Sequence, residues 1–465
     1  MPRETECATD GLVAIDALGP AGDYRTRNRE TVPNVAGVPV AELSVVPPLY
    51  AARAVDALRK TRPLPEAQRR EALAAAADIF AHNVVAGLDF DTYVHLTAQI
   101  SGLPISVTRA GACAVAEGVA SAFDAVLPAL PAGAVSDWRA LPAGRGGAVW
   151  TRRGEVFAVH ASGNGPGVHG LWPQAVALGY RVAVRPSRRE PLTAHRLIQA
   201  LRAGGFRPQD AVYLPTDHAG ADETIRAADL ALVYGGPDVV EKYAGDPRVL
   251  VNGPGRTKIL ITADRDWRDH LDVVVDSIVS LAGAACVNAT AVLYEGDPLP
   301  LAAAIAERLS QIEPLPVTDE RAMLPVQPLP KASALANYLA VEAAGATPLL
   351  GADTVVAPLG EGSAALRPAV HVVPEGDVRR INCELPFPCV WVSPWSHSTG
   401  LAPLRNSLVV TAITEDDDLI ESLIDEPTIA NVYRGHHPTY HCAPEIPHDG
   451  FLADVLMRCK GFVTD

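Results

Sequence analysis

Hydrophobic and polar positions change period along the chain, and the first 130 residues predict a hairpin followed by helices. Residues 32–44 alternate β-branched and polar residues around a glycine, which predicts a short extended hairpin. Alanine and leucine then recur at helical spacing between proline breaks in residues 51–61 and 65–84, and residues 87–130 continue as helix beyond a Gly-Leu-Pro break. We expect residues 1–31, which are mixed polar, to form an N-terminal arm.

Residues 133–155 interrupt the helical period with glycine, proline, tryptophan and arginine around short alternating runs. This pattern predicts an exposed β-hairpin. Such a hairpin serves either as an oligomer contact or as a surface loop, and the pattern favours neither.

From residue 156 the chain alternates strictly between short apolar runs and amphipathic runs. The apolar runs predict strands at 156–161, 181–186, 211–215 and 230–236. The amphipathic runs predict helices at 172–179, 192–205 and 221–228. Units this short predict a parallel sheet with helices on its faces.

A second α/β stretch begins at residue 249 and is followed by a polar, proline-rich end. Its predicted strands are 249–253, 258–262, 289–296, 370–374 and 390–395. Its predicted helices are 267–285 and 300–312. The sequence therefore predicts two α/β units joined in one chain.

Composition narrows the classes of protein that remain. The 465 residues can bury a large core without a disulfide or metal staple. A hydrophobic fraction of 48% and a charged fraction of 20% exclude a disordered chain, a collagen and a coiled coil. A net charge of −15 without a basic block argues against nucleic acid and anionic membranes as partners.

Cysteine usage and the N-terminus bear on compartment. The 7 cysteines form no CxxC pair and no zinc-spaced cluster with histidine, so we expect no metal. The N-terminus lacks a charged-then-apolar leader, and glycine, proline, asparagine and histidine interrupt the long uncharged stretch 161–180. We expect a reducing, cytoplasmic location.

Cys286 is the first candidate for chemistry. It follows a predicted helix in the run LAGAACVN, where small residues leave its backbone open to close approach. A cysteine thiolate is a strong nucleophile when its pKa is lowered by a helix terminus or a cation. The alternative is a buried small hydrophobe, which is the usual role of a free cysteine.

Asn164 is the second candidate, in the loop HASGNGPGVH after the strand 156–161. Ligands of open α/β sheets bind in loops at the carboxyl ends of strands. An asparagine amide there could stabilise an oxyanion. The alternative is a glycine-rich turn with a structural asparagine, and the loop is not a GxGxxG fingerprint.

Three further segments are candidates for binding a nucleotide. Two adjacent arginines in RPSRRE end the second strand, where a ribose or its phosphate would lie, unless they form only a solvated charge run. Gly235 and Gly236 stand where a strand turns into a helix, and backbone N–H groups there could face a pyrophosphate. Glu384 lies in the proline-stiffened run CELPFP and is otherwise a surface glutamate.

The order and spacing of these motifs resemble those of the aldehyde dehydrogenase superfamily, from about residue 32 to the end. Asn164 matches the asparagine after the first strand, and Cys286 matches the nucleophile of the Gly-x-x-Cys signature. Glu384 matches the glutamate that grips the nicotinamide ribose, and Gly235-Gly236 match the Gly-Ser turn of the cofactor site. Within the superfamily, ASGNGPG and RPSRREP look most like the acyl-CoA reductases of the type that supplies aldehyde to bacterial luciferase.

The resemblance implies an α/β fold with two parallel-sheet domains and a small bridging β oligomerisation element. It assigns cofactor binding to residues 32–132 and 156–248, and catalysis to residues 249–435. The bridging element would combine residues 133–155 with 436–465.

The departures from the family pattern carry information about the reaction. Aldehyde-oxidising members have a glutamate base where this chain has Asn252, and an amide cannot accept a proton at working pH. The ribose-binding lysine is replaced by Arg185, and the carboxylate that would repel a 2′-phosphate is replaced by Arg188. Ala284 replaces the glutamine of Gly-Gln-x-Cys, and Phe387 stands one position later than the family aromatic.

We therefore expect NAD(P)H-dependent reduction of an acyl thioester to an aldehyde, reversible as CoA-acylating aldehyde oxidation. Cys286 would form a thioester intermediate, and Asn164 with the Cys286 N–H would hold the oxyanion. Arg185, Ser187, Arg188, Gly235, Gly236 and Glu384 would bind the cofactor. We expect NADP(H) to be favoured over NAD(H), coenzyme A or an acyl carrier protein to be the thiol partner, and the chain to form a homodimer or homotetramer.

Three other functions fit parts of the pattern. A hydrolytic aldehyde dehydrogenase could take its base from Glu155 or His160, and its product would be an acid. A non-catalytic nucleotide-binding scaffold would bind cofactor without turnover. Transacylation through Cys286 would proceed without hydride transfer.

Overall fold

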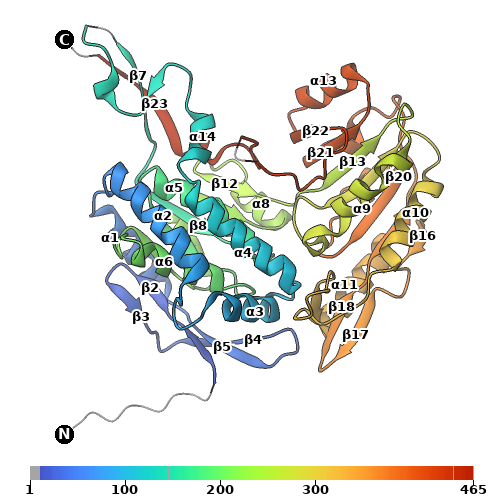
Figure 1. The fold of residues 1–465 in the computed structure, drawn as a ribbon, viewed down its shortest axis with the longest axis horizontal. Coiled ribbons are helices and arrows are strands. Elements are labelled where there is room, and N and C mark those ends of the chain that lie inside the picture. The colour runs from blue at the N-terminus through green and yellow to red at the C-terminus, as the bar shows by residue number, and fades with distance from the viewer. Residues whose placement is uncertain (1–10, 145, 444, 464) are drawn as a thin grey trace.

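A seven-stranded sheet forms the centre of the first domain in the computed structural model, which describes residues 11–465 except 145, 444 and 464 (Figure 1). Its order is β12-β11-β8-β9-β10-β2-β3, parallel from β12 to β10 and antiparallel at the β2–β3 edge. The strands are β2 (Ala17–Gly19), β3 (Gly22–Tyr24), β8 (Val156–His160), β9 (Arg181–Arg185), β10 (Ala211–Tyr213), β11 (Leu230–Tyr234) and β12 (Val249–Asn252).

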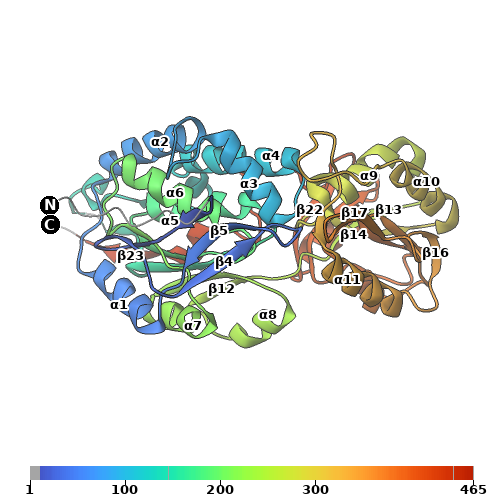
Figure 2. The same ribbon diagram turned by 90° about the horizontal axis from the view of Figure 1, so that it is seen from below.

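Helices cover both faces of this sheet, and Figure 2 shows the three layers edge-on. One face carries α2 (Glu66–His82), α3 (Phe90–Ser101), α4 (Ile105–Ala120), α5 (Pro173–Ala177) and α6 (Leu192–Ala203). The other carries α1 (Pro48–Arg59), α7 (His218–Ala227) and α8 (Pro237–Tyr243). Residues 156–159 of β8 are fully buried, because a parallel sheet is covered on both faces.

The strands and helices predicted between residues 156 and 236 are confirmed to within a few residues. The 32–44 hairpin is also confirmed: β4 (Arg29–Pro33) pairs antiparallel with β5 (Pro39–Ser44), and β1 (Val13–Ile15) adds a third strand. Residues 13–24 differ from the expected arm, because Ile15, Ala17 and Leu18 are buried and β2 extends the large sheet. Residues 1–10 of that arm lie outside the described residues.

The second domain contains another seven-stranded sheet, in the order β16-β19-β20-β14-β13-β21-β22. It is parallel except at the β16 edge. Its strands are β13 (Thr257–Ile261), β14 (Ala289–Tyr294), β16 (Thr347–Leu350), β19 (Ala369–Val372), β20 (Cys389–Pro394), β21 (Ser407–Ile413) and β22 (Ile429–Arg434). Its helices are α9 (Leu271–Val279), α10 (Pro298–Ser310), α11 (Leu329–Glu342), α12 (Val378–Ile381) and α13 (Asp417–Asp425). A small antiparallel sheet adds β15 (Val326–Pro328), β17 (Val356–Gly360) and β18 (Ser363–Leu366).

The boundary between the domains lies later than residue 249. Strand β12 pairs with β11 and so belongs to the first sheet, and the chain passes into the second domain between Asn252 and Thr257. The predicted helix 267–285 is also interrupted: α9 ends at Val279, and a distorted turn follows at Ser280–Gly283.

Residues 133–155 pair with the C-terminus, as the family resemblance implies, but they do not form a hairpin. Strand β6 (Ala134–Val135) runs parallel to β7 (Gly147–Arg152), whereas a hairpin requires antiparallel neighbours. The antiparallel partner of β7 is β23 (Met457–Phe462), which follows α14 (Leu452–Leu456). This sheet projects from the first domain (Figure 1). None of the helices in the described part of the chain has the length and apolar character needed to cross a bilayer.

Candidate active site

Cys286 lies in the loop between α9 and β14, on a backbone turn that ordinary residues rarely adopt. Leu281 and Ala282 have φ angles of 54° and 61°, and Gly283 has a φ of 61°. Left-handed backbone at a residue other than glycine costs about 1–3 kcal/mol, so surrounding contacts must hold the turn.

The side chain of Asn288 provides those contacts. Its amide nitrogen donates to the carbonyls of Ser277 (3.1 Å) and Ser280 (2.6 Å), at the end of α9. Its amide oxygen accepts from the N–H of Ala285 at 2.9 Å. One buried asparagine therefore ties the end of the helix to Ala285, the residue before Cys286.

Two glycines let other segments approach the turn closely. A Cβ at Gly255 would lie 1.7 Å from the carbonyl oxygen of Cys286, and a Cβ at Gly283 would lie 2.4 Å from the nitrogen of Pro388. The hydroxyl of Thr257 donates to the same Cys286 carbonyl at 2.9 Å. The link between the domains and the loop before β20 thus both pack against the turn that carries Cys286 (residues 280–286), which we call the nucleophile turn after its predicted role.

The environment of the Cys286 sulfur opposes ionisation. Burial raises the pKa of this thiol to about 12, and the nearby charge of Glu384 acts in the same direction. The backbone N–H groups of Cys286 and Val287 face the sulfur and partly offset that rise. At neutral pH the group is a thiol, and it needs a proton acceptor before it can attack.

His448 is the ionisable side chain in contact with the sulfur. Its Nε2 lies 3.5 Å from Cys286 Sγ, although the two residues are 162 positions apart. Burial lowers the pKa of His448, and Asp449 partly offsets this. The sequence prediction missed this residue, because nothing in the run CAPEIPHDG indicates which loop it will face.

Asn164 points toward the nucleophile turn from the loop after β8. Its amide nitrogen donates to the carbonyl of Ala284 at 3.4 Å, and its amide oxygen accepts from the Ser162 hydroxyl at 2.5 Å. Farther along, the side chains of His169 and Glu190 are both buried, with Nε2 and Oε2 3.6 Å apart. The expected partners Asn164 and Cys286 are therefore brought to the same region.

The arginine-rich loop lies beside the Asn164 loop at the carboxyl end of β9. The Nε of Arg185 is buried and has no hydrogen-bond partner among the described residues, and burial lowers the pKa of its guanidinium. A Cβ at Gly163 would lie 2.4 Å from the hydroxyl of Ser187, so the two loops touch. Arg188 forms an ion pair with Glu30 at 2.9 Å, a partner that the sequence prediction did not foresee.

Gly235 and Gly236 connect β11 to α8 at the same edge of the sheet, because β11, β8 and β9 are neighbouring parallel strands. A Cβ at Gly236 would meet no atom within 4 Å. The open backbone at Gly236, and the Arg185 Nε that has no partner in the described part of the chain, fit a bound dinucleotide, whose phosphates need N–H donors and cations. Gly235 instead packs against Val239, which a Cβ would meet at 2.4 Å.

Glu384 is held next to the nucleophile turn by backbone donors. Its Oε2 accepts from the N–H of Arg256 at 2.8 Å, and the N–H of Gly255 also faces it. Burial raises the pKa of this carboxyl despite those donors. Phe387, by contrast, is only 1% exposed and packs in the core of the second domain.

Asn252 lies at the end of β12, next to Tyr234 in the register of β11. It is buried, and its Oδ1 has no hydrogen-bond partner among the described residues. Burial raises the pKa of Tyr234, and the charge of Cys286 adds to that effect. The position that the family resemblance assigns to the base thus holds a buried amide, beside a tyrosine whose pKa is also raised by the charge of Cys286.

The two alternative bases considered from the sequence do not contact Cys286. Glu155 precedes β8 and pairs with Arg181 at 3.2 Å, at the opposite end of the strand from Asn164. His160 ends β8, and burial together with the charge of Arg185 lowers its pKa to about 3. Among the described residues, neither side chain is in hydrogen-bond contact with the Cys286 sulfur, so neither is placed to act as its base.

Comparison with known proteins gives a consistent result. The model of the aldehyde dehydrogenase family matches residues 164–451. Indole-3-acetaldehyde dehydrogenase of P. syringae, in complex with NAD+, has a TM-score of 0.82 and 16% identity, and the match covers 97% of each chain. Thermus thermophilus 1-pyrroline-5-carboxylate dehydrogenase has a TM-score of 0.80 and 15% identity, over 97% of this chain and 93% of that one.

A 3,6-anhydro-L-galactose dehydrogenase in complex with NADP has a TM-score of 0.80 and 17% identity, over 97% of this chain and all (100%) of that one. At these identities the solved structures show a shared fold. No curated protein sequence matches the chain.

Gly255→Ala should destabilise the protein and slow alkylation of Cys286. The added methyl group would meet the Cys286 carbonyl, and overpacking of this kind costs about 1–3 kcal/mol. The free energy of unfolding in urea and the alkylation rate measure the two effects. Gly236→Ala is the matched control, since its Cβ meets open space. Equal stability of both variants would mean that the close approach at Gly255 relaxes without cost.

Proposed function

The chain is an oxidoreductase of the aldehyde dehydrogenase family, and on that premise we propose that it reduces an acyl thioester to an aldehyde with a reduced nicotinamide cofactor. The acyl donor is a thioester of coenzyme A or of a carrier protein. In reverse, the same chemistry is CoA-acylating aldehyde oxidation. The motifs ASGNGPG and RPSRREP support this branch by their likeness to luciferase-type acyl-CoA reductases.

The observation that carries the proposal is the buried amide of Asn252. Hydrolytic release of an acyl-enzyme needs a base to activate water, and the family position for that base is Asn252. A thiol is acidic enough to exchange with the acyl-enzyme without that base. The substitution removes the hydrolytic route and leaves the thiol route intact.

Cys286 and Asn164 have different roles in the proposed acyl transfer. Cys286 forms a bond to the thioester carbonyl carbon, the bond from that carbon to the leaving thiol breaks, and the thiol departs with a proton. The amide of Asn164 and the N–H of Cys286 donate to the oxygen on which negative charge develops. A reduced nicotinamide, when bound, would supply the hydride that turns the acyl group into an aldehyde. The bond between the acyl carbon and the Cys286 sulfur then breaks, and the released thiolate takes a proton from solvent.

Arg185, Ser187, Arg188, Gly235, Gly236 and Glu384 are the residues that would hold the cofactor. The unpaired buried Nε of Arg185 supports an anionic ligand at the end of β9. Arg188, which stands where the family carboxylate would repel a 2′-phosphate, supports NADP(H) over NAD(H). Glu30 competes with that phosphate, because it already pairs with Arg188.

A product assay tests the reaction. With a panel of acyl-CoAs and reduced nicotinamides, the wild type should release aldehyde and free CoA in equal amounts. With aldehyde and oxidised cofactor it should need CoA and form the thioester. Cys286→Ala should form neither product while binding cofactor normally. Formation of free acid without CoA would contradict the proposal.

Asn164→Ala should reduce kcat for aldehyde formation by about 100- to 1,000-fold, the usual effect of losing one oxyanion donor. The KM for the thioester should change little, because the donor acts on charge that develops during the reaction. Steady-state kinetics on the same acyl-CoA separates the two constants. A rise in KM at unchanged kcat would instead make Asn164 a residue that only shapes its loop.

NADPH should be preferred over NADH by about tenfold in kcat/KM, which corresponds to about 1.4 kcal/mol. Arg188→Glu should reverse the preference, because it places a second carboxylate beside Glu30. Glu30→Gln is the matched control: it frees Arg188 and should keep or increase the preference. A wild type that favours NADH, or an unchanged ratio in Arg188→Glu, would remove Arg188 from the cofactor site.

A further inference from the structure

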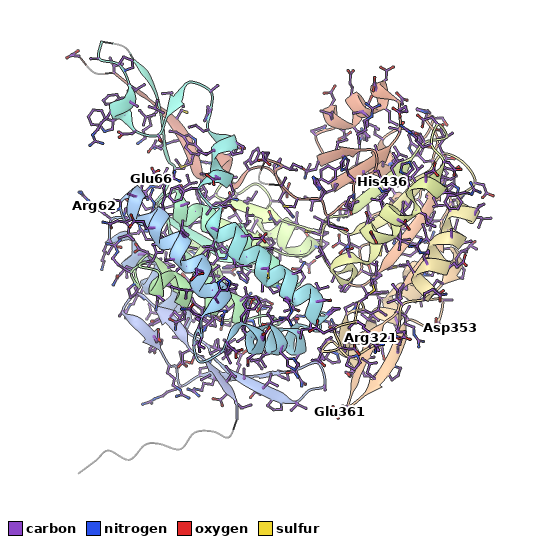
Figure 3. All side chains as sticks on the ribbon, viewed as in Figure 1. Arg62, Glu66, Arg321, Asp353, Glu361 and His436 are labelled. Atoms are coloured by element: carbon purple, nitrogen blue, oxygen red, sulfur yellow. The ribbon has the colours of Figure 1, made fainter. Side chains whose placement is uncertain are left out.

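The segment between β22 and α14 crosses from the second domain to the first (Figure 1), and its residue His448 contacts Cys286. Figure 3 labels His436 on the second domain, where the segment begins. The N–H of Thr439 donates to the Ser277 hydroxyl on α9 at 3.1 Å, and the hydroxyl of Thr411 donates to the carbonyl of His437 at 3.3 Å. Farther along, the side chain of Asn431 donates to the carbonyl of His448. The backbone is therefore anchored at His448 itself and, before it, at residues 437 and 439.

The anchored backbone sets the imidazole of His448 against the thiol. The distance of 3.5 Å from Nε2 to Sγ is a hydrogen-bond distance for sulfur. The other ring nitrogen, Nδ1, is buried and has no partner among the described residues. The ring thus contacts one reactive group and is not committed to a carboxylate or a carbonyl elsewhere.

We propose that His448 is a catalytic residue that accepts the Cys286 proton and returns it to the leaving thiol, a role that rests on the proposed acyl transfer. The Sγ–H bond breaks and its proton moves to Nε2, while sulfur bonds to the acyl carbon. When the bond between that carbon and the departing sulfur breaks, Nε2–H gives the proton to it. Imidazole is regenerated, and no external acid is consumed in the transfer.

The electrostatic surroundings are consistent with this direction of transfer. Three charged or titratable groups act on the pair. Asp449 raises the pKa of both the ring and the thiol, Glu384 raises the pKa of the thiol, and the pKa of Tyr234 is raised by the charge of Cys286. Burial lowers the pKa of His448, so the ring is neutral, and able to accept a proton, at neutral pH. Glu384 influences the thiol through its charge, while its Oε2 accepts from the N–H of Arg256.

The test is the pH dependence of Cys286 alkylation by iodoacetamide, followed by peptide mass spectrometry. In the wild type the rate should reach a plateau above the pKa of His448 and fall as the pH drops through it. In His448→Gln the rate at pH 7 should be about 100-fold lower and should rise tenfold per pH unit up to pH 9, because only the thiol's own ionisation remains. Exposed Cys113 provides an internal reference in the same digest.

His441→Gln is the matched control, since it changes an exposed histidine of the same segment whose ring faces Tyr433. It should leave the Cys286 profile unchanged. External imidazole should restore both alkylation and any thioester reduction in His448→Ala. A wild-type rate and profile in His448→Gln, or no rescue of a folded His448→Ala, would overturn the proposal.

Alkylation needs neither cofactor nor thioester, so it separates the two hypotheses. A protein that shows the paired pH profile but forms acid instead of aldehyde keeps the role of His448 and loses the proposed reaction. A protein that reduces thioesters with an unchanged His448→Gln profile keeps the reaction and loses the role.

Discussion

The close approach of Gly255 to the carbonyl of Cys286 is the constraint on which the site depends. Gly255 belongs to the short link between β12 of the first sheet and β13 of the second, so one segment both joins the domains and supports the nucleophile. The next residue, Arg256, gives its N–H to Glu384, and Thr257 gives its hydroxyl to Cys286. A side chain at position 255 would separate these contacts. The relative position of the domains and the geometry of the site therefore have the same cause.

This packing has a cost for the chemistry. A turn that is held by buried contacts surrounds the sulfur with atoms that do not solvate a charge, and burial raises the pKa of Cys286. Among the described residues, the main influences on the pKa of this thiol include no lysine or arginine, whereas Glu384 and Asp449 add negative charge nearby. Ionisation must be coupled to the reaction rather than completed beforehand. A neighbouring neutral imidazole meets that need, whereas a permanent cation would stabilise the thiolate in the resting state.

The sequence predicted the parts of the fold whose signal is local. Strands and helices from 156 to 236 are short, sharply periodic and separated by glycine or proline, so their order could be read directly. The pattern of β12 predicted a strand but not its neighbour, because pairing depends on residues far along the chain, and the strand was assigned to the second domain. The same limit explains β6 and β7. Their alternating run did not indicate that the two strands are parallel, or that β23 is the second neighbour of β7 in this sheet.

The candidate site likewise contains residues that the sequence indicated and partners that it did not. Asn164, Cys286 and Glu384 were proposed from the order of their motifs and the family resemblance, and the fold brings Asn164 and Glu384 close to the turn that carries Cys286. The partners that set their properties were missed: Asn288 holds the nucleophile turn, Glu30 holds Arg188, and His448 contacts the sulfur. These contacts join residues that are far apart in the chain or carry no motif of their own. His448 is the clearest case, because its ring needs no strong local contact: the backbone is fixed by Asn431 on one side, and by the pairing of β23 with β7 beyond it. Because backbone contacts position this histidine, its ring nitrogens are not used to hold it in place. No local sequence motif is needed for such a position, so the sequence did not indicate it.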